Sequence, residues 1–398
     1  MLAPVRYAHY AVIMLTSGAK FAPCTAPIAG GADMNAKISG GFIQATMFGG
    51  ALLACSALHA ATSNWSPPRT ADGKPVISGV WSNASVTNLT RPAGVTKLVV
   101  TREEAEALVK ANPFQRLIEA DNGPSDLNDN LLEDKNADRG YNAFWVDPGN
   151  FLASVNGEYR TSWIVEPANG QMPLSDAGRK LIQAGRAERD LNLYAGPEAL
   201  PLPERCLIAF SGASGPGMLN PMYNNNYQIV QTPDAVLINV EMVHDARIVP
   251  ISKDKATAQA SHKPAALNKW FGDPVGWWEG DTLVVETTHV NRQQAKQGPI
   301  FLSDQGKVTE RFSRASPDQL NYEFTVEDPA YYSQPWRAEM SFNARKENMY
   351  EYACHEGNYA MEGILRGARN QEAQGIKPSQ GPGIFGTPIP EKKNKGGL

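Results

Sequence analysis

The chain has 398 residues, a formal net charge of −4 at pH 7 and 42% hydrophobic residues, with 35 glycines and 29 prolines. This composition is that of a globular, turn-rich protein and excludes a disordered or coiled-coil chain. The small negative charge, without a dense cluster of lysines and arginines, gives no electrostatic basis for binding nucleic acid or an anionic membrane surface.

The N-terminus has the parts of a secretory signal. Met34-Asn-Ala-Lys is followed by a mostly small and apolar stretch over 42–58. A positive start and an apolar core are typical of export signals, and this core is too short and too rich in Gly and Ala for a membrane span. We therefore predict that residues 1–60 are a signal peptide with an over-long start, and that the protein is exported, periplasmic or extracellular. The alternative is a lipoprotein signal at 52–55, with a lipid anchor on Cys55.

Removal of this signal leaves two cysteines, Cys206 and Cys354. Because the compartment outside the cytoplasm is oxidising, two cysteines in an exported chain predict one disulfide. Two unpaired buried thiols are the alternative. Neither cysteine has a CxxC or CxxH partner, so a zinc site is the weaker alternative. We predict no metal and no cofactor.

The first half of the mature chain contains the predicted helices. Thr101-Arg-Glu-Glu104 is a capping box, in which a hydroxyl and a carboxylate satisfy free amides at a helix start. Helical insertions are predicted near 101–120 and 174–192. The Asp- and Asn-rich segment 121–139 lacks the glycine and the final carboxylate of a calcium loop, so we predict a solvated loop there.

The second half has a hydrophobic period of two. Leu320, Tyr322 and Phe324 alternate with polar neighbours, as a sheet with one covered face requires. A turn that feeds a short strand is predicted within 72–81, and further strands are predicted at 160–166, 236–243, 282–290, 308–314, 320–327, 337–343 and 349–354. Such a series predicts one mainly β domain over 61–370, an antiparallel meander closed into a lipocalin-like barrel or folded as a sandwich. Residues 371–398 are predicted to be a flexible tail.

Four polar residues at the end of one predicted strand are candidates for catalysis. His244 and Asp245 follow the strand at 236–243, with Glu241 before them and Arg247 just beyond. A histidine beside a carboxylate is an acid or base near neutral pH, and an arginine stabilises developing negative charge. This pattern predicts His244 as a base oriented by Asp245 or Glu241. The alternative is a polar turn in which Arg247 pairs with a carboxylate for structure.

Two other segments are candidates for ligand binding. Tyr223-Asn-Asn-Asn-Tyr227 offers amides and phenols for hydrogen bonds, although asparagines also suit a tight turn. The second segment follows Cys354, where a disulfide would hold the side chains rigidly. The candidate residues are Tyr223, Asn224, Asn225, Asn226, Tyr227, His355 and Glu356.

Several further side chains have open alternatives. Imidazole and carboxylate groups are ordinary metal ligands, so His244, Glu241, His355 and Glu356 could bind a divalent ion if the fold brought them together. We predict an exposed His262 in a lysine-flanked loop, and His289 as a polar tip at a strand end. Glu310 is a candidate general acid if it faces inward, and otherwise faces water.

The chain also has two resemblances. Ile77-Ser-Gly-Val-Trp81 resembles the Gly-x-Trp opening of lipocalin-like (calycin) barrels, although the helical insertions depart from a plain lipocalin. Segments such as Arg160-Thr-Ser-Trp-Ile-Val-Glu-Pro, and the runs at 223–231 and 278–287, resemble a family of exported bacterial proteins of unassigned function. This second resemblance extends over most of 65–369, implies export and assigns no catalytic residues.

Taken together, these features predict an exported β-barrel that binds a small, partly apolar organic molecule in the barrel mouth. One alternative is a periplasmic enzyme doing acid/base chemistry centred on His244, as a hydratase, isomerase, lyase or hydrolase. Another is a structural envelope protein. Convergence of His244, a carboxylate and Arg247 would favour the enzyme, and a filled interior with a broad apolar patch would favour the structural role.

Overall fold

The computed structural model describes residues 65–112, 115, 147–192, 194–267, 269–295 and 298–376. The signal peptide predicted at 1–60, with its alternative anchor Cys55, lies outside these residues. So do the solvated loop predicted at 121–139 and the predicted tail from residue 377 onward. The described residues belong to one compact unit, Ser63–Leu398.

The barrel strands form because their residues alternate between two environments. β11 (Lys307–Ser316) and β12 (Gln319–Glu327) make an antiparallel hairpin in which Phe312 lies opposite Tyr322. Every second residue of β12 is buried and those between are partly exposed. Since successive side chains of a strand point to opposite faces, the apolar set is turned to the inside of the sheet. The period of two predicted for this hairpin is confirmed.

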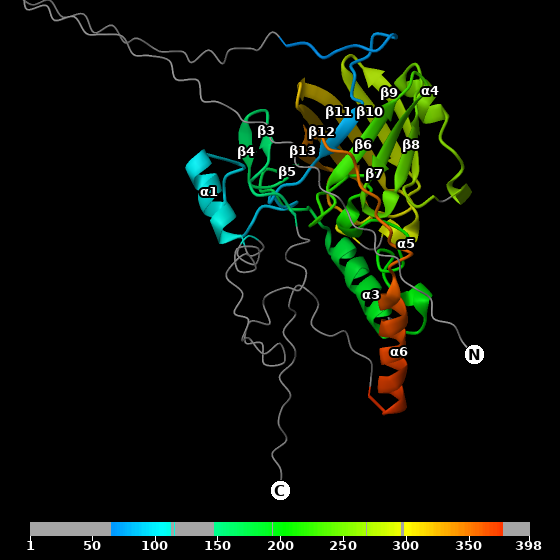
Figure 1. Cartoon of the computed structure of the whole chain (residues 1–398). Helices are drawn as coiled ribbons and strands as arrows, with labels where there is room; N and C mark the ends of the chain where they lie inside the picture. Colours follow the sequence, from blue (N-terminus) through cyan, green and yellow to red (C-terminus); the bar gives the residue numbers. More distant parts are fainter. Residues whose placement is uncertain are drawn as a thin grey trace, which may run out of the picture. The chain divides into compact units, whose positions relative to one another are not determined.

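Nine strands follow one another around a nearly closed barrel. Their order is β8-β7-β6-β1-β13-β12-β11-β10-β9, and each neighbouring pair along it is antiparallel. The other strands of this series are β1 (Gly79–Ser82), β6 (Asn226–Gln231), β7 (Ala235–Val240), β8 (Ala246–Pro250), β9 (Asp273–Glu279), β10 (Thr282–Thr288) and β13 (Trp336–Ala344). β5 (Ile164–Glu166) pairs with β13 beside this path. The prediction of a mainly β antiparallel meander closing into a barrel is confirmed (Figure 1).

The barrel closes at a seam between the end of β8 and β9. Ile251 and Gly276 form a parallel bridge there, and Ser252 N donates to Gly276 O at 2.8 Å. A Cβ atom on Gly276 would lie 2.8 Å from Ile251 Cδ1 and 2.9 Å from Val249 Cγ1. Glycine at this position therefore allows the two strands to approach each other.

The interior of the barrel is packed with side chains. The ring of Tyr322 lies 4.9 Å from that of Phe312 and 5.2 Å from that of Phe342, between centroids. Tyr227 contacts Phe342 at 5.0 Å. All four rings are at most 1% exposed. Because such interiors are close-packed, the space among these four rings is a hydrophobic core.

Short helices and a small second sheet accompany the barrel. The helices are α1 (Arg102–Ala111), α3 (Asp176–Asn192), α4 (Lys255–Ala260), α5 (Arg292–Ala295) and α6 (Tyr359–Ala373), and the sheet pairs β2 (Val99–Val100), β4 (Glu158–Arg160) and β3 (Ser154–Val155). The predicted capping box is present, since Glu104 N donates to Thr101 Oγ1 at 3.3 Å and Thr101 N to Glu104 Oε2 at 2.9 Å. Among the described residues, no helix has both the length and the apolar character needed to cross a bilayer.

The segment that follows β13 differs from its prediction. The strand predicted at 349–354 does not form, and residues 359–373 form helix α6 instead. Both edges of β13 are already paired, with β12 on one side and β1 on the other, so no edge is free for the next segment. The side chain of Asn358 caps α6 by accepting from Met361 N at 3.4 Å.

Candidate functional site

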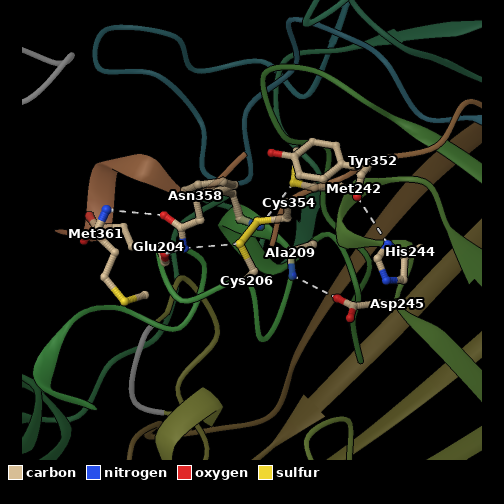
Figure 2. The surroundings of a disulfide bond; sticks show 11 residues. Glu204, Cys206, Ala209, Met242, His244, Asp245, Tyr352, Cys354, Asn358 and Met361 are labelled. Atoms are coloured by element: carbon tan, nitrogen blue, oxygen red, sulfur yellow. Dashed lines mark hydrogen bonds between the residues drawn. A yellow bond between two sulfur atoms is a disulfide. The ribbon is translucent and has the colours of Figure 1, made fainter. Parts of the chain in front are cut away.

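A disulfide joins the loop before β6 to the segment after β13. Cys206 and Cys354 are bonded, with 5.7 Å between their Cα atoms and a sequence separation of 148 residues. The predicted pairing of these cysteines is therefore present. Figure 2 shows the bond with Tyr352 and Met242 on one side and Asn358 and Met361 on the other.

A cleft of ≈ 1030 Å³ lies beside this disulfide. Its walls come from three stretches of chain, within 203–211, 221–224 and 351–364, together with Met242. Both cysteines contribute to the lining. Most of the remaining lining side chains are apolar, aromatic or thioether groups, which is typical of sites for small organic molecules.

Unusual backbone conformations gather around the cleft. Positive φ values occur at Cys206 (57°), Ser211 (54°), Asn224 (53°), Val243 (60°) and His244 (45°). For a β-branched residue such as Val243 this conformation is a genuine outlier. Residues held in sparsely populated conformations cluster at binding and active sites, so their concentration here supports a functional role for the cleft.

The structure brings only part of the predicted ligand-binding set to the cleft. Tyr223 and Asn224 line it. The next three residues turn elsewhere: Asn225 donates to Asp147 O at 3.0 Å, Asn226 bonds to Glu241, and Tyr227 is buried in the barrel. Burial raises the pKa of the Tyr227 phenol, which donates to Ala213 O at 3.0 Å. His355 and Glu356 are exposed between two lining residues and do not themselves line the cleft.

The four predicted catalytic residues have four separate sets of partners. His244 Nδ1 lies 3.3 Å from Tyr352 O, and Glu241 accepts from Tyr350 N at 3.1 Å as well as from Asn226. Asp245 bonds to Ser214 and Ala209. Arg247 faces the barrel interior from β8. No hydrogen bond or ion pair links any two of these four side chains, all of which the structure describes.

Arg247 and Glu310 form a fully buried ion pair inside the barrel. Arg247 Nη1 donates to Glu310 Oε1 at 2.9 Å, and both side chains are 0% exposed. The Tyr322 hydroxyl donates to the same oxygen at 2.6 Å, and Gly217 N approaches it at 3.4 Å. Glu310 therefore faces inward, which is the first of the two orientations predicted for it. Arg247 pairs with a carboxylate for structure, which was the predicted alternative to a catalytic role.

A glycine-rich loop covers this ion pair. A Cβ atom on Gly215 would lie 2.7 Å from Arg247 Nη1, so only glycine fits against the guanidinium. The same loop contributes Phe210 and Ser211 to the cleft. The loop is thus a shared wall between the barrel core and the cleft.

Asp245 fastens this loop to the β7–β8 connection. Its carboxylate accepts from Ala209 N at 2.9 Å and from Ser214 Oγ. Burial raises the pKa of Asp245 to about 6 from an ordinary value of 3.8, and the two hydrogen bonds oppose that rise. Between these two values the folded protein binds more protons than the unfolded chain.

This shift predicts a dependence of stability on pH. The contribution of Asp245 is fully present below the unfolded pKa and is lost as pH rises through the folded pKa. Between pH 4 and pH 7, we expect wild type to lose on the order of 2–3 kcal/mol of unfolding free energy more than Asp245→Asn. Urea unfolding at four pH values measures this difference, with the exposed Asp234→Asn as the control. Parallel curves for wild type and Asp245→Asn would contradict the shift.

His262 does not have its predicted exposed position. Its Nδ1 lies 2.9 Å from Asp273 Oδ2 and its Nε2 lies 3.4 Å from Glu286 Oε1. The His289 ring is 6.4 Å away, between centroids. No local pattern could have shown this cluster, because Asp273 and Glu286 belong to different strands, β9 and β10. It fixes the end of the α4 segment to the outside of the sheet.

Neither a metal site nor a known relative assigns a function to this protein. Within the part of the chain that the structure describes, no group of three or more His, Cys, Asp or Glu side chains is arranged to hold a metal ion. No protein-family model matches the chain, and no curated protein sequence matches it. The resemblances to lipocalin-like barrels and to exported bacterial proteins of unassigned function therefore stay predictions.

Proposed function

We propose that this protein is an exported binding protein that takes a small, partly apolar organic molecule into the cleft beside the Cys206–Cys354 disulfide. The observation that carries this proposal is the cleft itself, at ≈ 1030 Å³ and with a mostly apolar and aromatic lining. Ligand sites in proteins have volumes of roughly 300–1,000 Å³ and this kind of lining. The disulfide supports export, because such bonds persist in oxidising compartments.

Geometry favours binding over the two alternatives. A base at His244 oriented by a carboxylate predicts a hydrogen bond between the two, whereas His244, Asp245 and Arg247 have separate partners. A structural role would require a broad exposed apolar patch. Val230, Leu237 and Ile248 do form an exposed or partly exposed apolar row across β6, β7 and β8, but this row is only three side chains long. Leu181 lies apart from it, on α3.

Blocking the cleft tests the proposal. Ala353 and Ala360 both line it and are exposed, so tryptophans there obstruct the cleft without entering the core. We expect Ala353→Trp/Ala360→Trp to bind the neutral dye Nile red at least about tenfold more weakly than wild type, or about 1.4 kcal/mol. Dye fluorescence measures affinity, and native mass spectrometry of the protein purified from its own host shows any organic mass it retains.

The control for this test lies at the other end of α6. Ala373→Trp adds the same side chain outside the cleft, and we expect it to bind the dye as wild type does. Equal dye affinity for wild type and the doubly blocked variant, at equal unfolding midpoints, would place dye binding elsewhere and refute the proposal.

A further inference from the structure

The charged side chains of the cleft are both acidic. Glu204 and Glu351 line it, and none of the residues that line it is Lys, Arg or His. No hydrogen bond or ion pair joins either carboxylate to a described residue. Part of Glu204 is exposed to solvent, while neighbouring protein atoms raise the pKa of its carboxyl by desolvation. The cleft therefore presents negative charge that the protein itself does not neutralise.

Aromatic and thioether groups stand in the same cleft. Phe210 and Tyr223 meet edge to face, with 6.4 Å between ring centroids and 61° between planes. Tyr352 adds a third ring and Met361 a flexible thioether. The faces of aromatic rings attract cations, and methionine side chains adapt to apolar bodies of varied shape. These groups complement the two carboxylates in the class of ligand that they would attract.

The N-terminus of α6 contributes a positive potential to the cleft, and this potential is weaker than that of the two carboxylates. Ala360 and Met361 in its first turn line the cleft. A helix N-terminus carries roughly half of a positive charge. The Met361 amide is already capped by Asn358 Oδ1 at 3.4 Å. Two full carboxylate charges outweigh this partial charge, so the potential in the cleft favours cations.

We propose that the cleft binds an organic cation, namely a protonated or quaternary amine on an apolar or aromatic body. In this arrangement the ammonium group lies by the carboxylates of Glu204 and Glu351, and the body packs on Phe210, Tyr223 and Tyr352. This inference rests on the proposed binding function and specifies the chemical class of its ligand.

Three probes with one apolar body and different head groups test the inference. These are 4-phenylbutylamine, 4-phenylbutanol and 4-phenylbutanoate, titrated calorimetrically into the full chain at pH 7. We expect the amine to bind at least about fivefold more tightly than the alcohol, and the carboxylate to bind most weakly. Added salt should weaken binding of the amine and leave that of the alcohol unchanged.

Matched variants locate the effect. Glu204→Gln/Glu351→Gln removes both cleft charges. We expect this variant to bind the amine about fivefold or more weakly than wild type does, and to bind the alcohol with unchanged affinity. Glu188→Gln/Glu198→Gln makes the same change in net charge outside the cleft and should leave all three affinities unchanged.

The possible failures are distinguishable. Equal binding of amine and alcohol, tighter binding of the carboxylate, or an unchanged amine affinity in Glu204→Gln/Glu351→Gln would overturn the cation inference and leave the cleft proposal standing. If none of the three probes binds, and Nile red does not bind either, the binding function itself fails.

Discussion

Replacing Cys206 and Cys354 together by serine is expected to lower the unfolding free energy by up to about 5 kcal/mol. The bond closes a loop with a sequence separation of 148 residues. Chain-entropy arguments assign the largest stabilisation to such long loops, because the cross-link removes many conformations from the unfolded chain. Guanidinium unfolding of wild type, of the double serine variant and of wild type in reductant measures the loss.

This variant also has a functional readout. Because both cysteines line the cleft and join two of its walls, the double serine variant should bind Nile red more weakly even under conditions in which it is folded. The reduced wild type serves as the control, since it has the same broken bond without a substitution. A change in stability below about 1 kcal/mol, with dye binding intact, would show that the disulfide supports neither the fold nor the cleft.

Breaking the buried ion pair is expected to have an effect of similar size. Glu310→Gln leaves the Arg247 guanidinium charged, fully buried and without its partner. Removing one member of a buried pair costs about 3–5 kcal/mol, because the remaining charge has neither water nor a counter-charge. Urea unfolding of Glu310→Gln, compared with wild type, measures this cost.

A double-variant cycle separates the ion pair from general damage to the core. Arg247→Met removes the charge and retains much of the side-chain length. We expect Arg247→Met/Glu310→Gln to be more stable than Glu310→Gln alone, because no uncompensated charge remains inside the barrel. Additive losses in the two single variants would mean that the two side chains do not stabilise each other.

The disulfide, Asp245 and Glu310 all hold the same loop, which runs from Cys206 to Gly217. The disulfide holds one end at Cys206, Asp245 holds the middle at Ala209 and Ser214, and Glu310 contacts Gly217 near the other end. A loop fastened at three places loses little further entropy when a ligand binds. This preorganisation is a physical reason to expect useful affinity from a cleft that loops build.

Local patterns predicted the elements that local physics controls. The alternation around Tyr322 placed the β11–β12 hairpin, since a strand needs no distant information to have a period of two. The capping box at Thr101 placed the start of α1 for the same reason, because its two hydrogen bonds join residues three positions apart. The pairing of Cys206 with Cys354 followed from the predicted removal of the signal peptide, which would leave no other cysteine.

The site depended on contacts between distant segments. Tyr223 to Tyr227 read as one candidate set, yet strand β6 begins at Asn226 and directs Tyr227 into the core while Tyr223 and Asn224 remain at the cleft. His262 read as exposed, and only the pairing of β9 with β10 brings it two carboxylates.

By itself, the sequence determined that this protein is mainly β with helical insertions, and it predicted one disulfide, because periodicity, capping and cysteine count are local or compositional properties. Only the tertiary structure decided that Arg247 pairs with Glu310, and that the open space lies beside the disulfide and not inside the barrel. The physical reason is that burial and cavity shape depend on which strands and loops meet. These contacts are distant in sequence: Arg247 and Glu310 are 63 positions apart, and the two cysteines are 148 apart.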